Sequence, residues 1–232
     1  MTRIVSGTYF AELVARAWDG PDEIERDLQR NGSWSGWNEW RIGTVTEERI
    51  ERVAEGYEVS SACDLRFTAH VASLEDALFA RKIFALLHGD LFYSFGWPGW
   101  AGFMRMKNND PVRAPYSEDA KPYFVQLYEE AFAAYEPRLG EIESAIEQDG
   151  IWEEHGKRMR SVEGYPEIPD EGSEPVLDET WVEGSVRQSG VEVLWKSPTT
   201  ERAAVFVGIL NRLLADLIHA GAWSGPRQES TA

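Results

Sequence analysis

The stretch that most resembles a catalytic motif is Gly-Ser-Trp-Ser-Gly at residues 32–36. A nucleophile elbow requires a serine at the central position of such a stretch, and Trp34 occupies that position here. Gly156-Lys157 lacks the upstream glycine and the following serine or threonine of a phosphate-binding loop. The single cysteine and four histidines show no zinc-ligand spacing. Any catalysis would therefore depend on residues scattered along the chain.

The histidines and the cysteine each have a structural explanation that competes with a catalytic one. We expect His88 and His219 in the last turns of two helices, where a cation interacts favourably with the free carbonyls. His70 is expected on the polar side of a strand, and His155 is expected to be exposed after a helix end. Cys63 is interpreted as a small buried side chain rather than a reactive thiol.

Three tryptophans, Trp34, Trp37 and Trp40, follow one another at intervals of three residues. Gly32 and Gly36 disfavour a helix, so we predict a loop leading into a strand. Trp40 is then expected in the core, while Trp34 and Trp37 are expected to be half-exposed. Because tryptophan is enriched at binding hot spots, Trp34 and Trp37 are predicted to contact a partner.

A second aromatic segment, residues 89–106, interleaves aromatic rings with glycines. Tryptophan faces can bind sugars, bases or cations. The alternative is a loop that covers the core with its own rings. We take His70, Trp97 and Trp100 as a candidate ligand pocket.

The net charge of −17 is concentrated in residues 123–183, which contain 17 acidic and four basic residues. Phosphate backbones require the opposite sign, so direct nucleic-acid binding is not expected. An acidic surface attracts a basic protein partner, although it can also serve only as a solvated face. Five carboxylates are predicted to contact such a partner: Asp170, Glu171, Glu174, Asp178 and Glu179.

Length and composition indicate a globular chain, with 232 residues of which 43% are hydrophobic. We expect a single domain over residues 1–222, an acidic loop at about 161–179 and a flexible tail at 223–232. The sequence shows no signal peptide and no apolar run near the ~20 residues of a membrane span, so a cytoplasmic protein that contacts no membrane is predicted. No cofactor is predicted, and the oligomeric state is left open.

Two stretches share a strand-then-helix pattern. LRFTAHVA and VEVLWK each alternate apolar and polar residues, and helices are predicted after them over 74–88, ending at Gly89, and over 200–220. Between them an apolar stripe predicts a long helix over 123–147, which Pro137 should kink.

A shift of 126 residues aligns the two strand-then-helix units. Phe67 then matches Val193, and the predicted helix cap Ser73 matches Thr199. Residues 64–89 and 190–221 are therefore predicted to form a pseudo-repeat. The alternative is convergence on a common strand-helix pattern.

These observations predict an α+β fold with a mainly antiparallel or mixed sheet covered by helices. The predicted function is that of a non-catalytic acidic module that binds a basic protein, by analogy of charge and size with inhibitors, immunity proteins and antitoxins. The alternative is an enzyme or small-ligand-binding protein with a tryptophan-rich pocket.

Overall fold

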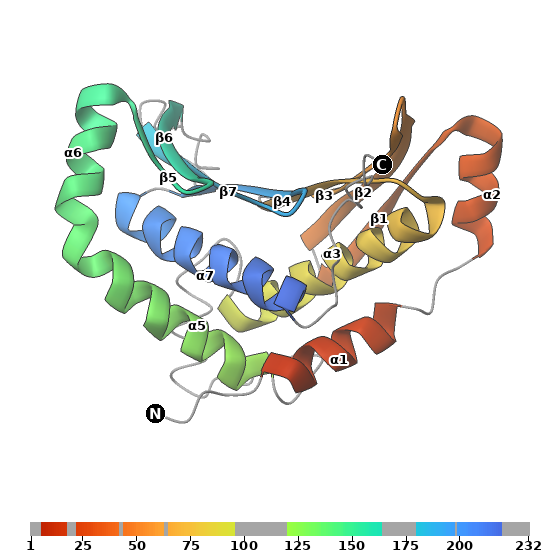
Figure 1. The fold of residues 1–232 in the computed structure, drawn as a ribbon, viewed down its shortest axis with the longest axis horizontal. Coiled ribbons are helices and arrows are strands. Elements are labelled where there is room, and N and C mark those ends of the chain that lie inside the picture. The colour runs from red at the N-terminus through yellow and green to blue at the C-terminus, as the bar shows by residue number, and fades with distance from the viewer. Residues whose placement is uncertain are drawn as a thin grey trace, which may run out of the picture.

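The computed structural model describes residues 6–17, 22–41, 44–62, 65–95, 120–163, 180–197 and 199–219. Eight strands form one antiparallel sheet in the order β1-β2-β3-β4-β8-β7-β6-β5 (Figure 1). The predicted α+β fold with an antiparallel sheet is confirmed. The strands are β1 (Ser33–Arg41), β2 (Thr44–Val53), β3 (Gly56–Ala62), β4 (Leu65–Val71), β5 (Ile151–Glu154), β6 (Lys157–Glu163), β7 (Thr180–Gln188) and β8 (Val191–Ser197).

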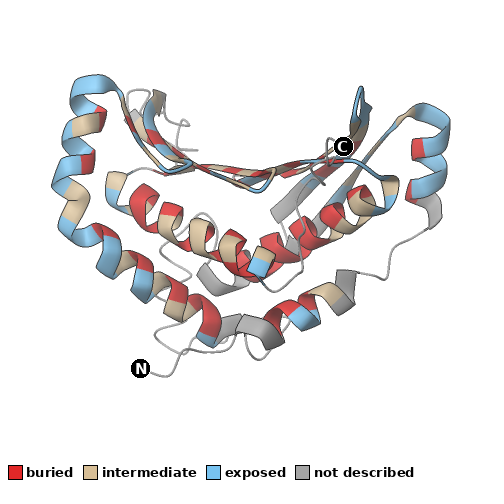
Figure 2. Cartoon of the chain, viewed as in Figure 1, coloured by how far each residue is buried: buried red, intermediate tan, exposed pale blue. Residues whose placement is uncertain are grey.

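The described helices cover one face of the sheet and flank its two lateral ends (Figure 1). They are α1 (Ser6–Ala17), α2 (Asp22–Asn31), α3 (Leu74–Phe95), α5 (Ala120–Tyr135), the short 3₁₀ helix η1 (Glu136–Arg138), α6 (Leu139–Asp149) and α7 (Thr200–His219). Buried residues lie where the helices face the sheet (Figure 2). Both ends of the sheet curve away from the helices, so its other face, the open face, is concave.

Among the described residues, the two halves repeat one order of elements, namely two α-helices, four strands and an α-helix, with η1 as an addition in the second half. Strands β4 and β8 pair antiparallel at the centre of the sheet, with Phe67 opposite Val193 and Leu65 opposite Trp195. Phe67 and Val193 are the residues that the 126-residue shift aligns. A two-fold axis through this pair therefore relates the halves, and the predicted pseudo-repeat is confirmed.

The helix caps follow the same symmetry. The Ser73 hydroxyl accepts a hydrogen bond from the Asp76 N–H (3.0 Å), and the Thr199 hydroxyl accepts one from the Arg202 N–H (3.3 Å). Both caps sit one residue before their helix and satisfy an amide that has no partner within it. The predicted alignment of Ser73 with Thr199 thus has a structural basis.

The duplication also includes the first helix of each half, which the sequence interpretation missed. Tyr9 and Phe10 in α1 correspond to Tyr123 and Phe124 in α5, 114 positions later. The four rings pack together in the core, with the rings of Tyr9 and Tyr123 stacked at 5.3 Å and the remaining pairs at larger angles. We call these four residues the aromatic quartet.

Each tyrosine of the aromatic quartet binds a buried aspartate of a helix in its own half. The Tyr9 hydroxyl donates to Asp90 Oδ2 (2.7 Å), and the Tyr123 hydroxyl donates to Asp216 Oδ2 (3.2 Å). Asp90 and Asp216 are 126 positions apart, so the two hydrogen bonds are equivalent under the pseudo-symmetry. Arg212 also donates to Asp216 at 3.1 Å.

The prediction that the third helix ends at Gly89 is wrong, because α3 continues to Phe95. A glycine costs an interior helix about 1 kcal/mol. Here Asp90 receives the Tyr9 hydrogen bond and Leu91 is fully buried, so contacts beyond Gly89 outweigh that cost.

The predicted effect of Pro137 is confirmed. The helix α5 ends at Tyr135, Pro137 lies in η1, and α6 begins at Leu139. Proline cannot donate the hydrogen bond of an interior helical residue, so the chain changes to 3₁₀ geometry there and α6 follows a new direction (Figure 1).

We expect Tyr9→Phe to lower the free energy of unfolding by about 1–3 kcal/mol, because the buried Asp90 carboxylate loses a donor while the ring packing is kept. Urea denaturation followed by circular dichroism would measure the change. Tyr123→Phe is the matched control, and it should cost less because its hydrogen bond is longer and Arg212 still contacts Asp216. Equal stability of Tyr9→Phe and the unaltered protein would contradict this role.

Candidate functional site

The open face of the sheet carries an exposed tryptophan. Trp37 has 70% of its surface exposed and points away from the helices in the middle of β1. The strand pairing places it opposite Glu47 of β2. Small polar residues surround the centre of this face, including Ser60 and Thr68. An exposed, rigidly held indole is the kind of side chain that anchors a protein–protein contact.

Trp34 lies on the other side of β1 and packs toward the helices. It is half-buried, and the Cζ atom of Arg81 lies 4.8 Å from its ring centroid. Arg81 Nε also binds Glu48 Oε2 at 2.7 Å, with only 1% of the Glu48 side chain exposed. This buried ion pair fixes the guanidinium against the indole. The position equivalent to Arg81 in the other half is Val207, so this arrangement belongs to one half only.

Both tryptophans were predicted to be half-exposed. The prediction is confirmed for Trp34, whereas Trp37 is more exposed than expected. The strand also begins earlier than predicted, because β1 already includes Ser33. Alternation along the strand sends Trp34 and Trp37 to opposite faces, so one flat partner surface cannot cover both rings. The side chain of Trp40, predicted to be buried, lies outside the part that the structure describes.

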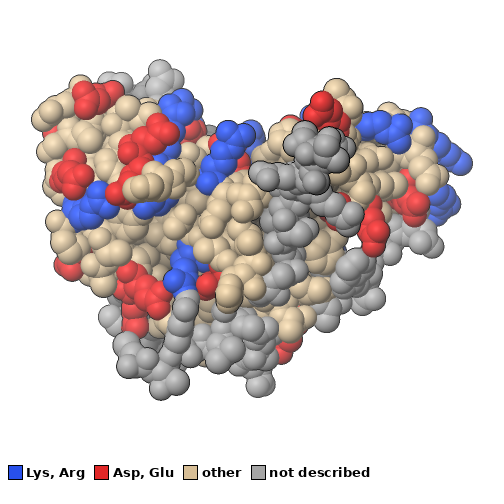
Figure 3. Space-filling view, in the orientation of Figure 1, with Lys and Arg blue, Asp and Glu red and all other residues tan. Residues whose placement is uncertain are grey.

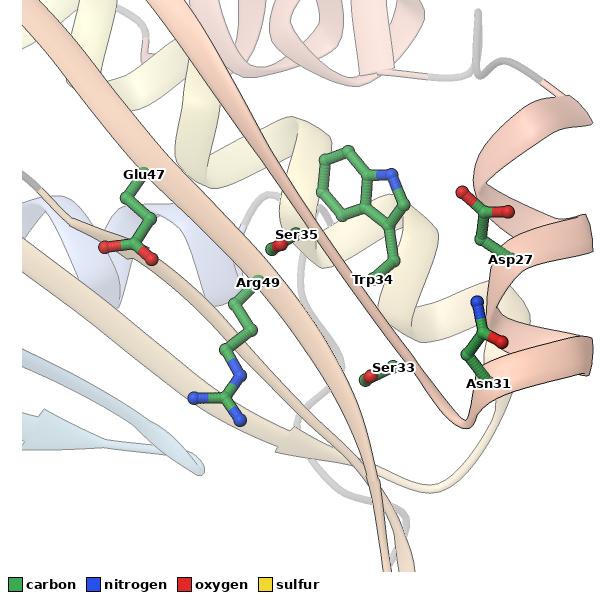
Figure 4. Close-up of a pocket in the computed structure, with 7 residues that line it drawn as sticks. All are labelled: Asp27, Asn31, Ser33, Trp34, Ser35, Glu47 and Arg49. Atoms are coloured by element: carbon green, nitrogen blue, oxygen red, sulfur yellow. The ribbon is translucent and has the colours of Figure 1, made fainter.

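A hollow of about 500 Å³ follows the outer edge of β1. Figure 4 shows Asp27 and Asn31 on α2, on the side of β1 where the Trp34 ring lies, while Glu47 and Arg49 of β2 lie on the other side of β1. Two carboxylates, Asp27 and Glu47, line the hollow. Its one cation, Arg49, forms a solvent-exposed ion pair with Glu51 at 2.6 Å. The complete lining is Asp27, Asn31, Ser33, Trp34, Ser35, Glu47 and Arg49.

The described part of the acidic segment lies mainly on α5 and α6 (Figure 3). Seven carboxylates there are exposed, namely Glu129, Glu130, Glu136, Glu141, Glu143, Glu147 and Asp149. Hydrogen bonds from Lys157 and Arg138 lower the pKa of Glu154 to about 2. Arg160 is bound to Glu183 at 2.6 Å. Three of the four basic residues between 123 and 183 are therefore engaged by carboxylates of the same segment.

His88 does not cap a helix, which corrects the prediction. It lies inside α3 with 3% exposure, and its Nε2 donates to the backbone oxygen of Ser61 at 3.0 Å. Burial lowers the pKa of His88 to about 4. The ring is therefore neutral at pH 7 and belongs to the core, against Phe67. The error follows from the helix end wrongly placed at Gly89.

His70 and His219 lie where they were expected, and His155 is exposed as expected but lies in a strand hairpin rather than after a helix end. His219 is exposed in the last turn of α7, and His155 is exposed in the turn between β5 and β6. His70 points outward from β4 on the open face, with its Nε2 3.5 Å from Glu58 Oε2. This weak, solvent-exposed pair does not by itself form a catalytic site.

Several predicted site residues fall outside the described ranges, as does Cys63, which was expected to be buried. The site residues are Trp97, Trp100, Asp170, Glu171, Glu174, Asp178 and Glu179. The last five belong to the connection between β6 and β7. In the sheet, β7 lies five strands from β1 and β6 lies six strands from it. Neighbouring strands are about 4.8 Å apart, so the strands that hold this connection lie roughly 25–30 Å from β1.

Among the described residues, no group of three or more histidine, cysteine, aspartate or glutamate side chains is placed to hold a metal ion. None of the described helices is long and apolar enough to cross a membrane. Comparison with protein-family models, with curated proteins and with solved structures finds no match.

The Arg81–Glu48 pair was missed in the sequence interpretation. One sequence signal existed, because Glu48 shares the inner side of β2 with the buried Ile50, where a carboxylate needs a partner. The identity of that partner, 33 residues away on α3, is not encoded in any local pattern.

The buried His88 predicts a pH dependence of stability. Its folded pKa of about 4 lies below the unfolded value of 6.5, so the unfolded chain binds more protons between these values and stability falls as the pH drops from 6.5 toward 4. We expect His88→Leu, which copies the equivalent Leu214, to reduce the loss of unfolding free energy between pH 7.5 and pH 5 by about 2 kcal/mol. Urea denaturation at both pH values measures it. An unchanged pH dependence would show that His88 is not responsible.

Proposed function

We propose that this chain is a non-catalytic protein-binding module that docks a basic protein partner, in the manner of an inhibitor, immunity or antitoxin protein. The observation that carries the proposal is Trp37, a 70% exposed indole held on the concave open face of a sheet. Leaving such a ring in water forgoes roughly 1.5–3 kcal/mol of hydrophobic stabilisation, which a partner that covers it would recover.

The charge distribution supports a basic partner. The exposed carboxylates of α5 and α6 have few cations beside them, and residues 164–179 add six more acidic residues without a basic one. Charges of this kind act mainly on the rate at which partners meet, because they attract over distances of about 10 Å at 0.1 M salt. The indole would then contribute to the lifetime of the complex.

A small-ligand function has one supporting observation, the hollow beside Trp34. Its volume of about 500 Å³ is that of a ligand pocket. Its lining is mostly polar and charged, whereas most ligand pockets are lined mainly by apolar side chains. We therefore favour protein binding.

The first test is capture of a partner from the native cell with the chain as bait, at low and at high salt, followed by mass spectrometry. We expect a basic protein that is retained at low salt and lost at high salt. Trp37→Ala should weaken its binding by about tenfold or more, as removal of a hot-spot tryptophan does. Val53→Ala, which truncates another exposed apolar side chain of the open face, is the matched control and should bind normally. Recovery of a co-purifying small molecule and no salt-sensitive basic protein would favour the ligand-binding alternative.

The second test concerns the acidic connection. Replacing Asp170, Glu171, Glu174, Asp178 and Glu179 by amides should slow association with the captured partner severalfold at low salt and leave dissociation unchanged. Stopped-flow or surface-plasmon measurements separate the two rates. The matched control neutralises five exposed carboxylates elsewhere: Glu12, Glu25, Glu55, Glu75 and Glu201. An equal slowing in both variants would mean that net charge, and not this segment, governs association.

A further inference from the structure

Strand β1 lies at an edge of the sheet and directs a set of backbone groups away from it. The Arg52 N–H donates to the Gly32 oxygen at 2.7 Å, and Gly32 stands opposite Arg52 in the β1–β2 register. In an antiparallel pair the residues that bond to the neighbour alternate with those that do not. The N–H and C=O groups of Ser33, Ser35 and Trp37 therefore point to the outer side of β1, where no described strand lies.

A helix flanks each edge of the sheet, α2 beside β1 and α6 beside β5, so the two edges differ in the strands themselves. Soluble proteins guard edge strands by keeping them short or by placing charges or proline on them. The equivalent strand β5 has four residues, two of them the carboxylates Glu153 and Glu154. Strand β1 has nine residues, and its first six, SWSGWN, contain neither a charge nor a proline, while Glu39 and Arg41 lie in its last three. The two edges of the duplicated fold have thus diverged, and among the described residues no strand pairs with the outer side of β1.

The hollow beside β1 is lined by two carboxylates and one arginine. The hollow beside the strand extends from α2 around its edge to the outer side of β2 (Figure 4). Asp27 lies on the α2 side and Glu47 on the β2 side, while Arg49 is bound to Glu51. An extended chain placed along β1 would direct alternate side chains to the two sides, so a lysine or arginine on either side meets a carboxylate.

We propose that β1 binds an extended, basic segment of the protein partner as an added strand, so that the eight-stranded sheet continues into the partner. This inference rests on the proposed protein-binding function and places the binding site on β1. Backbone hydrogen bonds to Ser33, Ser35 and Trp37 supply affinity independent of side-chain identity. The side chains around the hollow, above all Asp27, Glu47 and Trp37, supply the preference for a basic segment.

The probe is a phage-displayed library of random peptides of about twelve residues, long enough to span β1. We expect selection on the unaltered protein to enrich peptides rich in lysine or arginine and poor in proline. Ser35→Pro removes an outward N–H and leaves every bond to β2 in place. Proline is tolerated at such edge positions because their N–H does not take part in the sheet. It should lower the affinity of the enriched peptides by about tenfold. Glu153→Pro makes the equivalent change on β5 and is the matched control, with binding unchanged.

Two further measurements keep the test decisive if Ser35→Pro fails to fold. Asp27→Asn combined with Glu47→Gln leaves the backbone intact and should weaken peptide binding severalfold, whereas Glu143→Gln with Glu147→Gln on α6 should not. Amide exchange followed by NMR should show Ser33, Ser35 and Trp37 becoming protected when a peptide binds, with no change at the equivalent Ile151 and Glu153 of β5.

Four outcomes would overturn the binding of a partner segment along β1. Selection enriches no peptide, or it enriches only peptides that bind Ser35→Pro and the unaltered protein equally. In the third, sedimentation shows self-association that Ser35→Pro abolishes, which would identify a second copy of the chain as the occupant. If the partner captured from cells binds Ser35→Pro with undiminished affinity, the proposed function stands and only its placement on β1 is wrong.

Discussion

The burial of the aromatic quartet, Tyr9, Phe10, Tyr123 and Phe124, is the interaction that holds the two halves of the fold in their relative orientation. The β4–β8 pairing joins the halves through the sheet, and the stacked tyrosines join them on the helical side. Each tyrosine can be buried because its hydroxyl has an aspartate to bind, and each aspartate can be buried because it receives that bond. Because the halves are related by pseudo-symmetry, the same tyrosine–aspartate hydrogen bond occurs in both.

The differences between the halves are more informative about function than their similarity. Arg81, which orients Trp34, is replaced by Val207 in the second half, and the nine-residue β1 corresponds to the four-residue β5. Strands β2 and β3 are joined by a two-residue turn, whereas their equivalents are joined by the acidic residues 164–179. A duplicated scaffold needs both cores to keep their packing, so surface features that occur in only one half are where a binding role can be acquired.

Sequence patterns predicted the two central strands well. They predicted the end of α3, the extent of the repeat and the edge of the sheet poorly. The alternation in β4 and β8 predicted which residues are buried, because period-two patterns depend only on which side of a strand faces the core. The end of α3 was misplaced because Gly89 is a local stop signal that tertiary contacts at Asp90 and Leu91 override. The repeat of Tyr9 and Phe10 was overlooked because it occurs at a shift of 114 rather than 126, since the connections within the two halves differ in length. The sequence did indicate exposed tryptophan near 34–37, but not that β1 is an open edge, which depends on strand order.

The open face explains how such a protein remains folded without a partner and still binds one. It carries small polar side chains near its centre, such as Ser60 and Thr68, and the paired Arg160 and Glu183 toward its β5 end. Among the described residues, Trp37 and Val53 are the exposed large apolar side chains, so Trp37 is the one strong apolar anchor there. A partner that covers only this anchor would gain little buried surface. A partner that also continues the sheet along β1 would gain main-chain hydrogen bonds, and its geometry would be set by the strand rather than by side-chain packing alone. The position of the anchor on the edge strand, rather than at the centre of the concave face, is therefore the physical reason to expect recognition at the edge.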